Sequence, residues 1–166
     1  MDFSQFLPWA YFLVQNFGYP GIFLTNLIGS ATVLLPLPVA SLVFVFGAIL
    51  NPWLLGISAA LGATLGEIIG YGIGRGGGTL LEKKYERFFS KGKKWFEKGR
   101  GFLVIVFFAA TPLPDDVVGI LGGIFHYNFK KFILASLIGK MIMNLALALG
   151  GFYGLNWILN IFKISF

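Results

Sequence analysis

Pro36-Leu37-Pro38 and Pro112-Leu113-Pro114 interrupt two long apolar stretches of the chain, and these two motifs decide its fold. Gly47 follows Pro36 by eleven residues, and Gly123 follows Pro112 by the same spacing. Proline has no backbone N–H and clashes with the preceding helical turn, so each motif ends one helix before the next begins. The matched breaks predict two helical hairpins, one over residues 22–50 and one over residues 101–125.

A second similarity extends this repeat into the helices that follow the hairpins. A shift of 77 positions brings residues 53–74 onto residues 130–151, which include the apolar segment 132–151. The pairs that then coincide are Asn51 with Asn128, Gly62 with Gly139, and Gly74 with Gly151. Chance similarity between apolar helices is the alternative, but the equal spacing of the proline motifs favours a duplication, which is common in transporters.

The composition indicates a membrane protein. Of the 166 residues, 57% are apolar and 12% are charged, and the mean hydropathy is +0.80. Soluble domains carry about 25% charged residues. Stretches of about 20 residues with one charge or none are long enough to cross a bilayer core. We therefore expect an integral membrane protein, and the soluble, nucleic-acid-binding and disordered classes are excluded.

Few side chains are available for catalysis or metal binding. The chain has no cysteine, which excludes disulfides, thiolate metal sites and cysteine catalysis. Its single histidine, His126, leaves little for a zinc site or a serine-based triad. We therefore expect no metal, no cofactor and no enzymatic activity.

The patterning along the chain predicts a single membrane domain, 1–166, built from helices. Residues 3–17 alternate apolar and polar groups at helical spacing, which suits a helix lying in the membrane interface. Residues 53–74 and 132–151 predict two full spanning helices. The expected segments are repeat 1 over about 20–75, a basic amphipathic segment over 76–100, repeat 2 over about 101–151, and an interfacial or returning C-terminal helix over 152–166.

The basic residues indicate how the hairpins lie in the membrane. Nine of the thirteen fall between Arg75 and Arg100, and Lys130 and Lys131 follow the second hairpin. If that hairpin dips into the membrane and returns, all eleven lie on one side, as the positive-inside rule prefers. The first hairpin then enters from the opposite side, and the two halves are inverted. We expect a multi-pass cell-membrane protein with segment 75–100 and Lys130-Lys131 facing the cytoplasm.

The expected fold is thus an all-α integral membrane inverted repeat. It has two facing re-entrant helical hairpins, two full spanning helices and interfacial amphipathic helices. The residues that break the hairpins are Pro36, Pro38, Pro112 and Pro114. Irregular backbone near the midplane is tolerated only inside protein or along a wet cavity, so a cavity is expected where the hairpin tips meet.

Ionisable side chains interrupt the apolar segments at four positions: Glu67, Asp115, Asp116 and Lys140. Counted at helical rise from the basic residues, they converge at similar depths, about 12–16 Å from the cytoplasmic edge. An intramembrane charge costs at least about 2.5–3.5 kcal/mol, so each is by default a functional candidate. The structural alternative is an ion pair, of Glu67 or an aspartate with Lys140, that locks the repeats together.

The two aspartates follow a proline break, where a short helix begins. Capping of free N–H groups explains one of them. It explains two adjacent buried carboxylates poorly, because like charges disfavour the doubly ionised form. A carboxylate that holds a proton is what a proton-coupled carrier needs, so Glu67, Asp115 and Asp116 are the predicted proton relay.

Two stripes follow the predicted spanning helix 53–74. Its glycines recur at every fourth position and predict a flat face for close packing of another helix: Gly62, Gly66, Gly70 and Gly74. Glu67, Tyr71 and Arg75 form a neighbouring stripe. Tyr71 either hydrogen-bonds Glu67 or anchors at the interface, and Arg75 either binds a phosphate headgroup or marks the helix end.

These residues resemble a known signature. The DedA superfamily, also called the VTT-domain or SNARE-associated family, has motifs similar to Leu61-Gly62-Ala63-Thr64-Leu65-Gly66-Glu67, Tyr71-Gly72-Ile73-Gly74-Arg75, the two Pro-Leu-Pro motifs and Phe132…Gly139-Lys140. The resemblance covers about residues 20–150 and is closest to the small YqaA-like branch. It implies an inverted-repeat fold with facing re-entrant hairpins. Bacterial members are linked to recycling of polyprenyl-phosphate carriers and to proton-motive force, and eukaryotic relatives act as phospholipid scramblases.

The chain departs from the family pattern in both hairpins. Where the first hairpin usually has an acidic residue, this sequence has Ser30, Ala31, Val39 and Ala40. The second hairpin carries Thr111 and Asp115-Asp116 in place of the usual arginines. A phosphate site would therefore have to use Arg75, Arg100 or Lys140.

The expected function is that of a small lipid transporter or flippase for a polyprenyl-phosphate or phospholipid, with protons as a coupling ion. The expected substrate-binding residues are Lys140, Arg75, Tyr71, Arg100 and Asn144. Two alternatives stay open: a proton-coupled exporter of small cations or drugs, and a non-transporting membrane scaffold whose charges only lock helices together. Membrane lipids are the expected partners, nucleic acid is not, and a homodimer is open.

Overall fold

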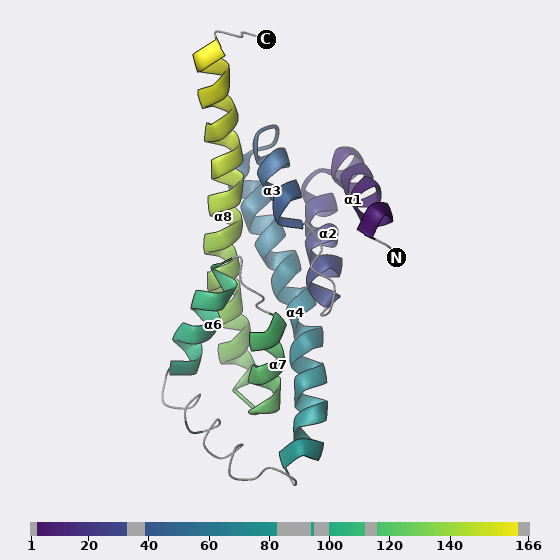
Figure 1. Cartoon of the computed structure of the whole chain (residues 1–166), viewed down its shortest axis with the longest axis vertical. Helices are drawn as coiled ribbons and strands as arrows, with labels where there is room; N and C mark the ends of the chain where they lie inside the picture. Colours follow the sequence, from purple (N-terminus) through teal and green to yellow (C-terminus); the bar gives the residue numbers. More distant parts are fainter. Residues whose placement is uncertain (1–2, 33–38, 83–93, 95–99, 112–115, 163–166) are drawn as a thin grey trace.

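The computed structural model describes residues 3–32, 39–82, 94, 100–111 and 116–162, which are helical apart from short turns (Figure 1). The helices are α1 (Phe3–Phe17), α2 (Tyr19–Ala31), α3 (Val39–Gly47), α4 (Pro52–Glu82), α6 (Gly101–Ala109), α7 (Asp116–Ile124) and α8 (Phe129–Phe162). The all-α prediction is confirmed over these ranges, and the predicted helix 3–17 forms as α1. Its place in a membrane interface stays a prediction.

Two long helices, α4 and α8, pack against each other and run in opposite directions (Figure 1). Each begins at an asparagine cap. The Oδ1 of Asn51 accepts a hydrogen bond from the N–H of Trp53 at 3.0 Å, and the Oδ1 of Asn128 accepts one from Lys131 at 3.1 Å. These are the two asparagines that the sequence repeat pairs. Both helices contain a stretch long and apolar enough to cross a membrane, as predicted: Pro52–Gly77 and Phe129–Gly154.

Each Pro-Leu-Pro motif lies between two short helices. Helices α2 and α3 flank the first motif and occupy the upper half of Figure 1, whereas α6 and α7 flank the second and occupy the lower half. The predicted interruption of both apolar segments is therefore confirmed. The prolines that we expected to cause it, Pro36, Pro38, Pro112 and Pro114, lie outside the described residues, and re-entry into a membrane stays a prediction.

The two halves interlock through close backbone approaches at glycine. Gly47 on α3 lies against the Ala148 carbonyl of α8, and Gly123 on α7 lies against the Tyr71 carbonyl of α4. A Cβ at either glycine would collide with that backbone. The second helix of each hairpin therefore packs on the long helix of the other half, and residues that the sequence repeat pairs make equivalent contacts.

The glycine stripe of α4 provides the close packing that its spacing predicts, and it does so for two different helices. Gly62 and Gly66 lie against backbone carbonyls of α2, and Gly74 lies against the Ile120 carbonyl of α7. Gly70, the fourth member, is buried. The stripe thus holds one helix from each hairpin against α4.

Two expected helix ends are wrong. Helix α4 continues past residue 74 to Glu82, into the segment that we expected to be separate, and α8 continues past residue 152 to Phe162 without a turn back. Glycines stand at both expected boundaries, at Gly76-Gly77 and Gly150-Gly151, and neither pair ends its helix. Glycine lowers helix stability by about 1 kcal/mol but, unlike proline, obstructs no hydrogen bond, so a long apolar helix continues through it.

Apolar side chains cover the outer faces of both long helices. On α4 they recur every fourth residue, are 43–58% exposed, and are Leu61, Leu65, Ile69 and Ile73. On α8 the corresponding stripe is Leu134, Ile138 and Ile142. Exposed apolar stripes of this extent are unfavourable in water and favourable against lipid hydrocarbon.

We predict opposite effects of alanine at two neighbouring glycines of α4. In Gly74→Ala the new methyl group would collide with the Ile120 carbonyl, so unfolding should become easier by about 1–3 kcal/mol. Gly72 has open space around its Cβ position, so Gly72→Ala should be neutral or slightly stabilising. Thermal unfolding of the two variants in the same detergent measures the difference, and equal melting temperatures would contradict the packing described.

Candidate functional site

The long helices are joined by a buried ion pair. Glu67 projects from α4 and Lys140 from α8, and the Lys140 Nζ lies 3.1 Å from the Glu67 Oε1. The side chains are only 3% and 8% exposed. An isolated charge at such a position is strongly disfavoured, so each group offsets the other's loss of solvent. The ion pair between Glu67 and Lys140, which the sequence analysis gave as one alternative, is therefore formed.

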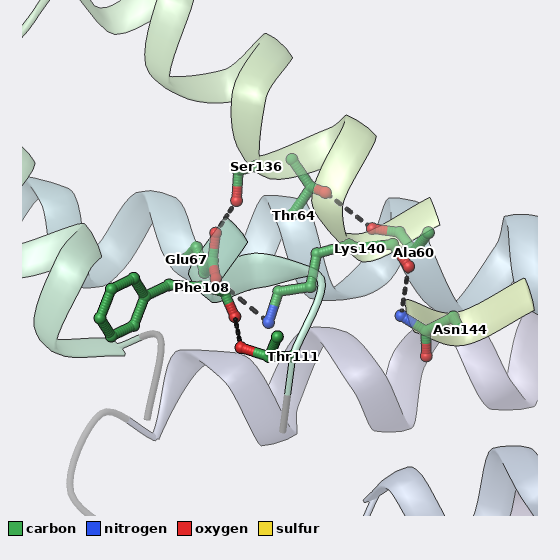
Figure 2. Close-up of polar contacts among 8 residues, drawn as sticks. All are labelled: Ala60, Thr64, Glu67, Phe108, Thr111, Ser136, Lys140 and Asn144. Carbon is green, nitrogen blue, oxygen red and sulfur yellow. Dashed lines mark hydrogen bonds and ion pairs between the residues drawn. The ribbon is translucent and has the colours of Figure 1, made fainter. Parts of the chain in front are cut away.

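Ser136 completes the coordination of the carboxylate. It lies one turn before Lys140 on α8, is fully buried, and donates its hydroxyl hydrogen to the Glu67 Oε2. Figure 2 shows Ser136 and Lys140 reaching the two oxygens of Glu67 from the same helix. We call Glu67, Ser136 and Lys140 the charge cluster. Both oxygens of the glutamate therefore have a donor on α8.

Polar neighbours of the charge cluster are bonded to their own helices. The Thr64 hydroxyl donates to the Ala60 carbonyl at 2.8 Å, and the Asn144 amide donates to the Lys140 carbonyl at 2.9 Å (Figure 2). Asn144, expected to bind substrate, is buried in this arrangement. In the sequence repeat Asn144 also stands at the position equivalent to Glu67. The two halves therefore have a neutral and an acidic side chain at equivalent positions of their long helices.

The first turn of α7 lies beside the charge cluster. A Cβ at Gly119 would lie 3.9 Å from the backbone oxygen of Glu67. Asp116 is the first residue of α7, one turn before Gly119, but its side chain lies outside the described part of the structure. Asp115, the other predicted relay residue, lies outside the described residues altogether.

Tyr71 and Arg75 form a second polar group, further along α4. The Tyr71 hydroxyl donates to the Tyr127 carbonyl and accepts a hydrogen bond from the Arg75 Nη1 at 2.8 Å. Of the alternatives for Tyr71, a hydrogen bond to Glu67 is therefore not formed. Tyr71 is buried, whereas the Arg75 side chain is exposed. Burial raises the pKa of the nearby Tyr127 hydroxyl above its ordinary value, so this group stays protonated.

Arg100, also expected to bind substrate, stands apart from both groups. It directly precedes α6, is exposed, and makes no hydrogen bond or ion pair with the other residues that the structure describes. The predicted site residues therefore fall into a buried cluster at Glu67 and a surface group at Arg75. They lie two turns apart on α4, about 12 Å at helical rise.

Comparison with known proteins assigns the family. A family model described as the VTT domain matches residues 37–153. The match begins within the first Pro-Leu-Pro motif, extends through most of α8 and includes the whole charge cluster. The chain belongs to the VTT-domain family. This confirms the resemblance read from the glycine and proline motifs, and it fits the apolar outer faces, because members of this family are membrane proteins.

Individual relatives of this VTT-domain chain are distant. Two "alkaline phosphatase-like" proteins of Lactococcus lactis, from subspecies cremoris and lactis, are 28% and 29% identical over 87% of this chain and 75% of their own. An uncharacterized protein of Methanocaldococcus jannaschii is 26% identical over 78% of this chain and 81% of its own. No solved structure matches the chain.

Sequence reasoning missed one member of the VTT-domain charge cluster. Ser136 stands four residues before Lys140, so helical spacing places both on one face of α8. That spacing could have indicated the contact, but serine is common in close-packed membrane helices and does not by itself indicate a functional site. Over the described ranges, no group of three or more His, Asp or Glu side chains could hold a metal ion.

We predict that the charge cluster behaves as a coupled pair in unfolding. Glu67→Gln or Lys140→Met alone removes one charge and leaves the other buried, which should reduce stability by about 3–5 kcal/mol. The double variant Glu67→Gln/Lys140→Met buries no charge at this pair and should recover much of that loss. Thermal unfolding in detergent measures all three, and purely additive losses would contradict the pairing.

Proposed function

We propose that this VTT-domain protein moves a phosphate-bearing lipid across the cell membrane and couples the movement to protons at Glu67. The observation that carries the proposal is the buried ion pair between α4 and α8. Intramembrane charges mark substrate or ion pathways in transporters, and this pair links two long helices that belong to different halves of the chain.

The arrangement of the halves supports alternating access. Helices α3 and α7 each pack on the long helix of the opposite half through glycine contacts. Two equivalent halves that run in opposite directions can exchange contacts, so that an opening on one side becomes an opening on the other. In this proposal the hairpins α2–α3 and α6–α7 are re-entrant and enter from opposite faces of the membrane.

The charge cluster supports coupling by exchange of partners. When Glu67 accepts a proton, it no longer balances the Lys140 ammonium, and an anionic phosphate can take the place of the carboxylate. When the phosphate leaves, Glu67 loses its proton and pairs with Lys140 again. For a lipid with a singly charged phosphate, proton and anion then travel together and no net charge crosses with them. Asp116 begins α7, one turn before Gly119, whose backbone lies near that of Glu67, and in this proposal Asp116 passes the proton.

The relatives are consistent with an anionic substrate. The two Lactococcus proteins are named alkaline phosphatase-like, and in this proposal phosphate is the anion that Lys140 and Arg75 meet. The proposal includes no hydrolytic step. The orientation that fits the basic residues places the Arg75 end of α4 and the start of α8 at the cytoplasm.

Lipid movement in vesicles tests the proposed function. Purified protein is placed in phosphatidylcholine vesicles with a fluorescent polyprenyl phosphate or phosphatidylglycerol, and dithionite reports the fraction in the outer leaflet with and without a pH gradient. We expect movement that depends on the protein and responds to the gradient. Glu67→Gln and Asp116→Asn should each abolish the response, because neither amide can bind and release the proton.

Thr64→Val is the matched control for this assay. Thr64 lies on the same buried face of α4, but its hydroxyl bonds only to its own helix, so movement should be unchanged. Wild-type vesicles that move neither lipid would contradict the proposal. Cation-dependent proton flux in the same vesicles would then favour the small-cation exporter.

Single-cysteine labelling tests the orientation. The sequence has no natural cysteine, so each variant carries one site for the reagent. Ile49→Cys lies in the exposed turn before α4, and Lys131→Cys lies in the exposed first turn of α8. In intact cells a membrane-impermeant maleimide should label the cysteine at 49 and reach the one at 131 only after permeabilisation. Labelling of both without permeabilisation would contradict the inverted arrangement.

A further inference from the structure

A basic cavity of about 810 Å³ lies between α6, the start of α8 and the exposed end of α4. Its charged lining is Arg75, Lys130 and Lys131, and Phe102 and Phe129 provide apolar walls. The cavity also sits at the N-terminus of α8, where the helix dipole adds partial positive charge. It is therefore a concentrated positive region beside apolar surface.

An apolar cleft of about 530 Å³ adjoins this cavity. It is lined by Ile68, Gly72 and Gly76 of α4 together with Phe129, and it shares Phe129 and Arg75 with the basic cavity. Gly72 and Gly76 have open space around their Cβ positions, so the lack of side chains there is what leaves the cleft open. Ile68, which lines the cleft, is the residue after Glu67 in the sequence.

Arg75 is oriented where the two cavities meet. Its Nη1 donates to the Tyr71 hydroxyl at 2.8 Å, and Tyr71 is itself anchored to the Tyr127 carbonyl. A guanidinium has five N–H donors in a planar fork, so one bond to Tyr71 leaves donors for a second partner. In the part of the chain that the structure describes, no carboxylate pairs with Arg75, Lys130 or Lys131.

We propose that the basic cavity and the apolar cleft together hold one phosphate-bearing lipid, with the headgroup at Arg75, Lys130 and Lys131 and one hydrocarbon chain along Gly72 and Gly76. Arginine binds phosphate oxygens through paired donors, lysine adds a point charge, and a helix N-terminus favours an anion. The apolar cleft selects a lipid over free phosphate, because a soluble anion gains nothing from it.

This site deepens the proposed function, since it gives the place where the cytoplasmic headgroup is held before it reaches the charge cluster. Binding here requires no transport and no change at Glu67. The two proposals can therefore fail separately: a protein that binds lipid at this site without moving it would retain the site and lose the transport function.

Binding of short-chain lipids to the full-length protein in detergent tests the site. Isothermal titration calorimetry compares dioctanoyl phosphatidylglycerol with dioctanoyl phosphatidylcholine and glycerol 3-phosphate. We expect phosphatidylglycerol to bind more tightly than either. Arg75→Gln and Lys130→Gln/Lys131→Gln should each weaken its binding about tenfold, as the loss of a charge-assisted hydrogen bond implies.

The cleft is tested by a matched pair of leucine substitutions. Gly72 and Gly77 both have open space around their Cβ positions, but only Gly72 lines the cleft. Gly72→Leu should weaken phosphatidylglycerol binding by a similar factor while Gly77→Leu leaves it unchanged, and both variants should keep the wild-type melting temperature. Equal effects of the two leucines would overturn the chain site.

Two further outcomes would overturn the lipid assignment as a whole. Glycerol 3-phosphate that binds as tightly as phosphatidylglycerol would show a site for soluble phosphates. Phosphatidylcholine that binds as tightly as phosphatidylglycerol would show that the three basic side chains do not select the headgroup.

Discussion

The ion pair between Glu67 and Lys140 is the contact on which the rest of the structure depends. It joins α4 to α8 through two buried side chains, and Ser136 donates to the second carboxylate oxygen. A buried pair of this kind adds little net stability compared with apolar packing, yet the loss of one partner strongly lowers the free energy of unfolding. Such a contact is stable only while both helices keep their register.

A symmetric frame surrounds this asymmetric centre. Both long helices start at an asparagine cap, and Gly47 and Gly123 bring the hairpins against them in equivalent ways. The equivalence ends at the charges, since Glu67 stands where the other half has Asn144. The surface group at Arg75 lies two turns from the pair on the same helix, and the apolar cleft is lined by residues of α4 between Ile68 and Gly76.

The sequence allowed much of this fold to be predicted, because prolines and regularly spaced glycines impose local constraints. The two interrupted segments, the long helices and the close packing at Gly62 and Gly74 follow from residues whose effects are steric. The ends of α4 and α8 could not be predicted, since glycine permits both a turn and a helix and tertiary packing decides between them. The sequence left the pairing of Glu67 with Lys140 as one of several alternatives. The contact of Ser136 and the basic cavity at Lys130 depend on how each helix is rotated about its axis, and the sequence pattern alone does not determine that rotation.

Access to the buried centre distinguishes a transporter from a scaffold most directly. Ser136 and Ala135 are both fully buried on α8, but only Ser136 contacts Glu67, whereas Ala135 packs in an apolar cluster with Tyr71 and Phe132. In proteoliposomes, a small membrane-impermeant thiosulfonate should modify Ser136→Cys, faster under a pH gradient, and leave Ala135→Cys unmodified. Alternating access predicts this result, because the charge cluster must open to water. Complete protection of both cysteines, with Lys131→Cys labelled as a control, would contradict the account and leave the pair as a lock between helices.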